Sequence, residues 1–222
     1  MSDTLPTVDP AINDLREYME GLFTGDDELL QSLVRETYAV TQHPRMLGDR
    51  WLCTFMEWLI ATHPLHHVLE LGTFTGYSSL RLARAVGGAG SVTTIESSTL
   101  HADIAEKYFT KADITERITL LRGSVCSLLP TLLGQHFDLV YVDADKAEYP
   151  QYLDLLRPLL HVGSIIVADN ILWGGKTYTP SEHDARTKAL RVFNQALFAD
   201  PSFKTTLLPA GDGVIVATKI AG

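Results

Sequence analysis

From His67 onward, runs of apolar residues alternate with segments whose apolar positions recur at helical spacing. The runs are nearly continuous in apolar residues, which is typical of strands buried on both faces of a parallel sheet. Helical segments separate the first five runs, and another over about His183–Ala199 precedes the sixth. This order predicts an α/β fold with a doubly wound sheet. The seven predicted strands are Val68–Leu71, Ser91–Ile95, Ile118–Leu121, Phe137–Val142, Ser164–Ala168, Thr205–Leu208 and Val214–Thr218.

The last two runs are joined differently from the others. Only the segment Pro209–Gly213 separates them, and it contains two glycines and a proline. A parallel crossover needs a dozen or more residues, so this connection is too short for one. The last two strands are therefore predicted to pair as an antiparallel hairpin.

The first sixty or so residues have a helical pattern instead. Helices are predicted over about Asp9–Leu22, Asp26–Val40 and Gly48–Ala61. With 222 residues and no repeat, low-complexity tract or long linker, the chain is expected to form a single domain over 1–222. Within it, residues 1–62 would cover the substrate and cofactor sites, and residues 63–222 would form the core.

Two acidic clusters stand where apolar runs end. Asp143 follows the fourth run, with Lys146 three residues later, and Asp169 and Asn170 follow the fifth. Parallel strands present their carboxyl ends at one edge of the sheet, where open α/β sheets bind ligands. Two carboxylates and an amide oxygen suit Mg²⁺, Mn²⁺ or Ca²⁺ rather than zinc. Either aspartate alone is as readily explained as a helix cap, but the combination with Asn170 and Lys146 favours a metal site with a lysine base.

The first run leads into a glycine-containing turn, Gly72 to Gly76. Its G-x-x-x-G spacing differs from the dinucleotide fingerprint G-x-G-x-x-G. Glu70 precedes the first glycine by two residues, and Ser78 follows the second. This arrangement suits a cofactor without a pyrophosphate, such as S-adenosylmethionine. Glu70 would attract its ammonium group, directly or through water, and Ser78 would help to hold its carboxylate.

One residue, Glu96, and one segment, Gly123 to Val125, extend this predicted cofactor site. Glu96 ends the second run, 20 residues after Gly76, where a carboxylate can accept both ribose hydroxyls. Gly123, Ser124 and Val125 follow the third run and would border an adenine pocket. Ser124 is equally well explained as the N-cap of the next helix.

Composition and charge restrict the environment and the partners. The net charge is −9, which argues against nucleic acid as the default partner. Cys53 and Cys126 are the only cysteines, so neither a disulfide framework nor a zinc site is expected, and a reducing cytosol fits. We find no secretory leader and no apolar stretch long enough to span a membrane. A cytoplasmic protein that does not associate with membranes is expected.

Four segments together resemble the metal-dependent class I O-methyltransferases of the caffeoyl-CoA and catechol type. They are Leu69–Ser78, Val142–Lys146, Ala168–Gly175 and Leu208–Gly213, and the resemblance extends from about Asp26 to the C-terminus. It implies a Rossmann-like, seven-stranded methyltransferase sheet whose last strand is antiparallel. It also implies a homodimer, because bacterial and plant members are commonly dimeric.

The resemblance also assigns roles to individual residues. Asp143, Asp169 and Asn170 would bind the metal, and Lys146 would be the catalytic base, with Asp143 beside it. Lys146, Asn170 and Trp173 would contact the acceptor. The implied S-adenosylmethionine site consists of Leu47, Glu70, Gly72, Thr73, Phe74, Ser78, Glu96, Val125 and Asp143.

These roles predict methylation of a catechol-like small molecule. The metal would hold both vicinal oxygens and acidify the attacking hydroxyl, and Lys146 would accept its proton. Trp173 would form a wall for the aromatic ring, or else merely anchor its loop. Three alternatives remain open on the sequence: the same chemistry on a hydroxylated uridine of transfer RNA, a Mg²⁺-dependent phosphatase using Asp143 and Asp145, and a binding module without catalysis.

Overall fold

The computed structural model describes residues 18, 19, 21–23 and 25–221. The helix predicted over Asp9–Leu22 falls mostly outside these residues, and only its positions 18, 19, 21 and 22 are described, as helical. The other two predicted N-terminal helices are present as α2 (Glu28–Val40) and α3 (Arg50–Thr62). Among the described residues, none of the helices combines the length and apolar character needed to cross a membrane.

One mixed sheet of seven strands runs through the molecule in the order β3-β2-β1-β4-β5-β7-β6. Strand β7 pairs antiparallel with both β5 and β6, whereas the other pairs are parallel. The predicted doubly wound sheet, its antiparallel last strand and the C-terminal hairpin are therefore confirmed. The strands are β1 (His67–Leu71), β2 (Ser91–Glu96), β3 (Ile118–Arg122), β4 (Phe137–Val142), β5 (Leu160–Ala168), β6 (Phe203–Leu208) and β7 (Val214–Lys219).

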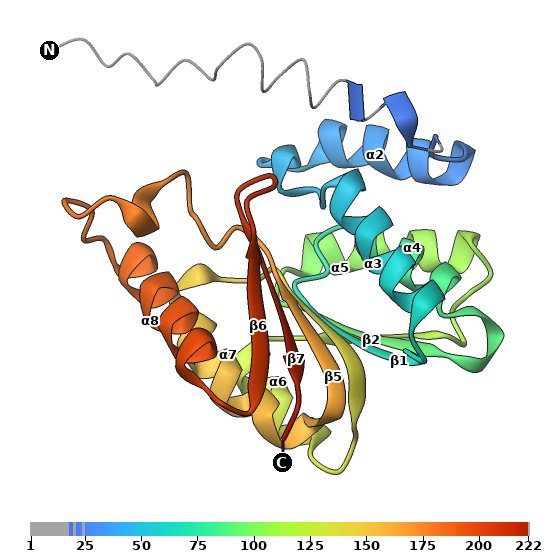
Figure 1. The fold of residues 1–222 in the computed structure, drawn as a ribbon. Coiled ribbons are helices and arrows are strands. Elements are labelled where there is room, and N and C mark those ends of the chain that lie inside the picture. The colour runs from blue at the N-terminus through green and yellow to red at the C-terminus, as the bar shows by residue number, and fades with distance from the viewer. Residues whose placement is uncertain (1–17, 20, 24, 222) are drawn as a thin grey trace, which may run out of the picture.

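Helices cover both faces of this sheet, with α3, α4 and α5 on one side and α6, α7 and α8 on the other (Figure 1). Side-chain caps begin several of them: Asp27, Ser98 and Asp184 accept hydrogen bonds from the first turns of α2, α5 and α8. The remaining helices are α4 (Tyr77–Ala85), α5 (Thr99–Lys111), α6 (Val125–Leu128), α7 (Tyr149–Leu156) and α8 (Ala185–Ala199), and the short 3₁₀ turns are η1 (Pro44–Met46), η2 (Gly87–Ala89), η3 (Leu129–Leu132), η4 (Lys146–Glu148), η5 (Arg157–Leu159) and η6 (Lys176–Tyr178).

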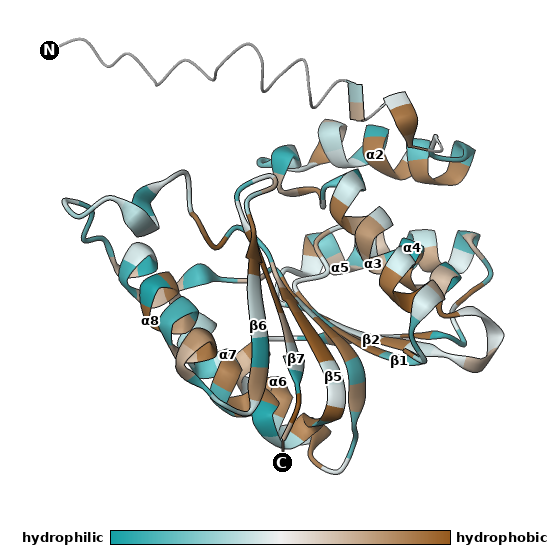
Figure 2. Cartoon of the chain, viewed as in Figure 1, coloured by the Kyte–Doolittle hydropathy of each residue, from teal (hydrophilic) through white to brown (hydrophobic). Residues whose placement is uncertain are grey.

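Two apolar cores explain why the strand sequences are almost continuously apolar. In β4, Leu139 and Tyr141 belong to the core under α3, α4 and α5, whereas Val140 and Val142 belong to the core under α6, α7 and α8. Successive side chains of a strand point to opposite faces, so a strand covered on both faces needs apolar residues throughout. Figure 2 shows this concentration of apolar residues along the central strands.

The central strands bring the predicted functional segments to one edge. In the register of the sheet, Leu71 of β1 pairs with Val142 of β4, and Val142 pairs with Ala168 of β5. The residues that follow these three strand ends therefore lie side by side. The strand order also reverses between β1 and β4, the position where open α/β sheets bind ligands.

Strand β5 begins earlier than the sequence predicts. It runs from Leu160 rather than from Ser164, and its pairing with β4 shifts register between Phe137 and Leu139. Gly163, with φ of 101°, accommodates the extra residues. The Ser164 hydroxyl donates to the Phe137 carbonyl at 2.7 Å, and this hydrogen bond stabilises the register shift. The glycine and the polar residues of this bulge interrupt the apolar run, which is why the pattern predicted a shorter strand.

Candidate active site

A cavity of about 600 Å³ opens at the carboxyl ends of the central strands. It collects side chains from the turn after β1, the ends of β2, β4 and β5, and the segment between η1 and α3. All but one of the residues to which the resemblance assigns a role line it. Those that line it are Leu47, Gly72, Thr73, Phe74, Ser78, Glu96, Val125, Asp143, Lys146, Asp169, Asn170 and Trp173.

The turn after β1 approaches the end of β4 through Gly72. This residue has φ of 98°, and a Cβ atom there would overlap the backbone oxygen of Asp143. Only glycine fits both the conformation and the space. The backbone N–H groups of Gly72 and Thr73 both donate to the Ile95 carbonyl at 3.1 Å, which fastens the turn to β2. The predicted cofactor turn and the first predicted metal ligand are thus in main-chain contact.

Glu96 is held rigidly at the end of β2. Its Oε2 accepts from the Phe74 N–H at 2.8 Å, and its Oε1 accepts from the Ser98 N–H at 2.7 Å. Phe74 itself has a left-handed backbone conformation, with φ of 49°. Each carboxylate oxygen has further lone pairs beyond these bonds, so the group is oriented in advance and can still accept from a ligand.

Glu70 is the residue with an assigned role that does not line the cavity, and Gly123, which was expected to border an adenine pocket, does not line it either. Glu70 is fully buried behind Ser78, whose hydroxyl donates to Oε1 at 2.5 Å. The hydroxyls of Ser79 and Thr94 donate to Oε2, the latter at 2.6 Å. Burial raises the pKa of this carboxyl to about 7, against the opposing effect of the three hydroxyl donors. Glu70 therefore reaches the cavity through Ser78 rather than with its own oxygens.

Asp143 and Asp169 stand at the ends of β4 and β5 with Asn170 beside them. Burial and the nearby negative charge of Asp143 raise the pKa of the Asp169 carboxyl. Asn170 has φ of 57°, and among the described residues its side-chain amide makes no hydrogen bond. Two facing carboxylates and an amide without a protein partner are a donor set that fits a hard divalent cation. The described part of the chain contains no group of three His, Cys, Asp or Glu suited to a metal.

Lys146 lies beside this pair and is almost fully buried. Its Nζ donates to Asp143 Oδ1 and to the hydroxyl of Tyr149, both at 2.7 Å. The Tyr149 hydroxyl in turn faces the carbonyls of Val142 and Asp169, at 3.0 and 3.1 Å. Burial, with the charges of Asp143 and Asp169 adding to it, raises the pKa of Tyr149 well above its ordinary value, so this hydroxyl stays neutral. Two acceptors thus fix the ammonium group of Lys146 at the cavity wall.

Tyr149 was not among the residues expected from the sequence. It begins α7, three residues after Lys146, a spacing that brings two side chains to the same side of a helical turn. This three-residue spacing from Lys146 is the feature of the sequence that could have identified Tyr149.

Other lining residues without a sequence prediction come from the mouth of the cavity. They include Arg45, Asp49 and His101, and also Arg186, whose Nε lies 3.6 Å from Asp145 Oδ1. They come from separate turns and helices, and only the fold brings them together.

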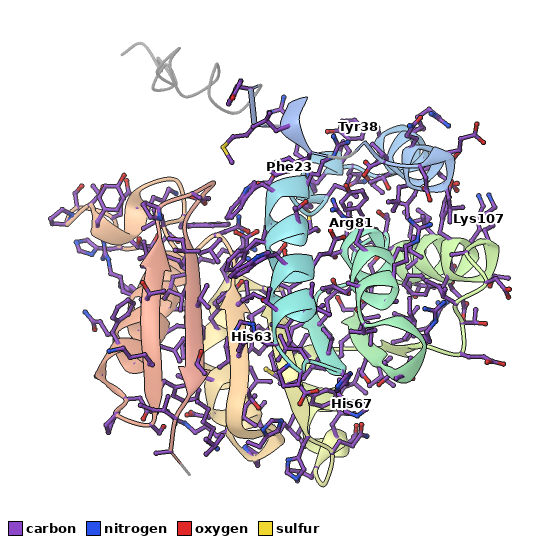
Figure 3. The ribbon with its side chains drawn as sticks, turned by 45° about the vertical axis from the view of Figure 1, so that its right-hand side comes forward. Phe23, Tyr38, His63, His67, Arg81 and Lys107 are labelled. Carbon is purple, nitrogen blue, oxygen red and sulfur yellow. The ribbon has the colours of Figure 1, made fainter. Side chains whose placement is uncertain are left out.

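An ionic network attaches the N-terminal helices to the cavity wall. Tyr77, which lines the cavity, donates through its hydroxyl to Asp26 at 2.9 Å, and Arg50 pairs with Asp26 at 3.0 Å. Arg81 pairs with Glu57 at 2.6 Å, and Figure 3 shows Arg81 between α3 and α4. The N-terminal helices are therefore tied to the same helix, α4, that carries Ser78.

Trp173 stands at the boundary between the cavity and an apolar core. It lines the cavity and also packs against the core on the α6, α7 and α8 side. Its backbone has φ of 52°, and the next N–H, that of Gly174, donates to Asp212 Oδ1 at 2.7 Å. The indole is thus both a wall and an anchor of its segment.

Comparisons with known proteins agree with this geometry. Residues 21–220 match the profile of a family described as O-methyltransferase. A catechol O-methyltransferase of Mycobacterium tuberculosis is 31% identical over 195 residues, 88% of either chain. Caffeoyl-CoA O-methyltransferase 1 of Eucalyptus globulus is 30% identical, with 75% of this chain and 72% of that protein covered. The crystal structure of an O-methyltransferase from Bacillus cereus in complex with SAH superposes with a TM-score of 0.85 at 26% identity, over 93% of this chain and 97% of that one.

Proposed function

The chain belongs to the O-methyltransferase family of S-adenosylmethionine-dependent enzymes, and we propose that it methylates one of two vicinal hydroxyls of a catechol-like small molecule with the help of a divalent cation. The observation that carries this proposal is the meeting of Asp143, Asp169, Asn170 and Lys146 in one cavity with the turn after β1. Catechol, caffeate and caffeoyl-CoA-like or flavonoid acceptors all present the required pair of hydroxyls.

The donor end of the cavity suits S-adenosylmethionine. Glu96 would accept both ribose hydroxyls, because its carboxylate is already oriented by two backbone N–H groups. Ser78 would face the methionine end, with Glu70 supplying negative charge from behind. Leu47, Gly72, Thr73, Phe74, Val125 and Asp143 would complete the walls around the cofactor.

Asp143, Asp169 and Asn170 would hold Mg²⁺, or Mn²⁺ or Ca²⁺ in its place. A bound divalent cation supplies two things: it neutralises the facing carboxylates, and it lowers the pKa of a hydroxyl that it binds. Burial and the neighbouring charge of Asp143 both raise the pKa of Asp169, which supports such a site, because a buried carboxylate beside a second carboxylate needs compensating positive charge. Lys146 supplies one positive charge from the protein itself.

The remaining steps belong to the protein's own residues. Lys146 would act in its neutral amine form, in which Nζ, held in place by Asp143 and Tyr149, would accept the proton of the attacking hydroxyl. Asn170 and the indole of Trp173 would contact the acceptor, with the indole fixing the plane of its ring. Methyl transfer is an in-line displacement at the sulfonium methyl, so most of the catalytic effect comes from alignment.

Family membership sets aside two of the alternatives. A phosphatase and a non-catalytic binding module both leave the match over residues 21–220 unexplained. Transfer RNA as the acceptor requires the same chemistry, and it is opposed by the net charge of −9.

We further propose that the enzyme is a cytoplasmic homodimer. Support for cytoplasmic location comes from Cys53 and Cys126, both of which are free. Support for dimerisation comes from exposed apolar side chains of the N-terminal helices, Tyr38 at 57% and Trp58 at 56% exposed. Light scattering after gel filtration tests the dimer, and a monomer at micromolar concentration would contradict it.

The decisive experiment is a methyl-transfer screen with labelled S-adenosylmethionine. It compares catechol, caffeate, caffeoyl-CoA, a monophenol and bulk transfer RNA, each with and without Mg²⁺. We expect label in the vicinal diols only, and only with the metal. Label in the monophenol at an equal rate, or transfer that persists without metal, would contradict chelation as the basis of recognition. Label in transfer RNA alone would show that the acceptor is a nucleoside of transfer RNA rather than a small catechol.

A further inference from the structure

Trp173, in the wall of the cavity, belongs to the connection between β5 and α8. Residues 172–182 of this connection are called segment 172–182 here. Only the short 3₁₀ turn η6 gives it regular structure. Its own hydrogen bonds are turn contacts between near neighbours, including Lys176 N–H to the Trp173 carbonyl at 3.2 Å, Thr177 N–H to the Leu172 carbonyl at 3.3 Å and the Thr179 hydroxyl to the Gly175 carbonyl at 2.9 Å. Turn contacts of this kind shape the segment locally, and its placement against the cavity depends on contacts from outside it.

Arg191 of α8 supplies these contacts. Its Nε donates to the Thr177 carbonyl at 2.8 Å, and its Nη1 donates to the Glu182 carbonyl at 2.7 Å. Its Nη2 donates to the carbonyls of Lys176 and Thr179, at 2.8 and 2.5 Å. Within the part of the chain that the structure describes, no carboxylate pairs with this guanidinium. The charge of Arg191 is therefore directed at four main-chain oxygens spread along segment 172–182.

The other end of segment 172–182 is held from the opposite side. Asp212, in the turn between β6 and β7, accepts from the Gly174 N–H at 2.7 Å through its carboxylate and from the Leu172 N–H at 2.9 Å through its carbonyl. Trp173 lies between these two bonds with φ of 52°, a left-handed conformation that a bulky residue keeps only under restraint. The conformation of Trp173 thus depends on Asp212, which binds the N–H groups on both sides of it, and on Arg191, which binds the segment further along the chain.

We propose that Arg191 is a positioning residue for the acceptor: by clamping segment 172–182 it holds the Trp173 wall in the orientation that receives the aromatic ring. The inference rests on the proposed function for the identity of the acceptor, but the clamp itself does not. A lysine cannot replace the arginine, because one ammonium group cannot reach four carbonyls that a planar guanidinium fork contacts from three nitrogens. The predicted donor residues Gly72 and Glu96 stand at the ends of β1 and β2, and β4 separates these strands from β5, which leads to Trp173, so cofactor binding is expected to be independent of the clamp.

The test compares Arg191→Met, Arg191→Lys and a matched control, Lys188→Met, which removes a cation from an exposed position of the same helix. Hydrogen exchange of the apo protein reports on the clamp. We expect amides of segment 172–182 to exchange about tenfold faster or more in both Arg191 variants, the effect of losing one charge-assisted hydrogen bond or more. The control and the amides of the central strands should be unchanged, which also shows that the variants are folded.

Kinetics then separate positioning from a merely structural role. With the best acceptor from the screen, KM for the acceptor should rise about tenfold in Arg191→Lys and Arg191→Met, with kcat reduced less and S-adenosylmethionine affinity within about twofold of the wild type. Unchanged exchange in segment 172–182 would overturn the clamp. Faster exchange with an unchanged acceptor KM would overturn the positioning role. Absence of turnover by the wild type with any acceptor would instead contradict the proposed function, and exchange alone would then decide whether Arg191 holds the segment.

Discussion

Burial of Glu70 makes the stability of the apo enzyme depend on pH in a predictable direction. The carboxyl has an ordinary pKa of 4.5 and a folded-state pKa of about 7. A difference of about 2.5 units corresponds to about 3 kcal/mol of preference for the protonated form in the folded state. Because the folded pKa is the higher one, the full stability is present below about pH 4.5 and is lost as pH rises through about 7. The free energy of unfolding should therefore fall across this window.

Glu70→Gln isolates this contribution from that of other groups, Asp169 included. The neutral amide keeps the shape, and the hydroxyls around it can each donate or accept. Urea unfolding of both proteins should be measured at several values between about pH 5 and pH 8. Over this range the free energy of unfolding of the variant should rise by about 2 kcal/mol relative to that of the wild type. Glu116→Gln, at an exposed position, is the control and should follow the wild type. Parallel curves for Glu70→Gln and the wild type would refute the reasoning, because the carboxylate would then be no more costly inside the protein than in water.

Three further predictions concern the cavity. Glu96→Ala should weaken S-adenosylmethionine binding by about 1.5–3 kcal/mol in calorimetry, since a charged acceptor is lost; unchanged affinity would locate the ribose elsewhere. Lys146→Ala should lower kcat by about 10²–10⁴-fold with cofactor affinity nearly kept, and the opposite pattern in steady-state kinetics and calorimetry would make it a binding residue. Chelation of the metal should abolish methylation while the circular dichroism spectrum stays native, because the proposed ligands stand on a preformed sheet edge. Asp169→Ala should behave in the same way. Unfolding on chelation would contradict a purely catalytic metal.

The sequence predicts this fold well because burial on both faces leaves a strong pattern. The run Phe137–Val142 matches β4 at both ends, since its side chains alternate between two apolar cores and all must be apolar. Prediction is weaker where the strand is irregular. The start of β5 at Leu160 is missed, because the pairing there includes a bulge whose stability comes from Gly163 and from a hydrogen bond to β4. Such a contact joins residues far apart in the chain and leaves no local pattern.

The site shows the same division. Residues at strand ends are predictable, because the sheet topology alone brings Asp143 and Asp169 to one edge. Residues that act through others are not, and Tyr149 and Arg191 are the examples. Their roles depend on which hydroxyl or carbonyl lies within hydrogen-bond distance after folding. Glu70 illustrates the converse: the sequence identifies the residue, but only packing reveals that Ser78 covers it.

The main-chain contact between Gly72 and Asp143 limits the ways in which this enzyme can evolve. The predicted donor turn and the end of β4 meet there through backbone atoms, so a side chain added at Gly72 would displace both. Segment 172–182 reaches the cavity only through Trp173, and the Arg191 side chain and the turn at Asp212 attach it to the rest of the molecule. Its length and sequence can change without displacing the donor. New acceptor preferences in descendants of this protein are therefore expected to arise by exchange of that segment, while the machinery for handling the methyl donor is inherited intact.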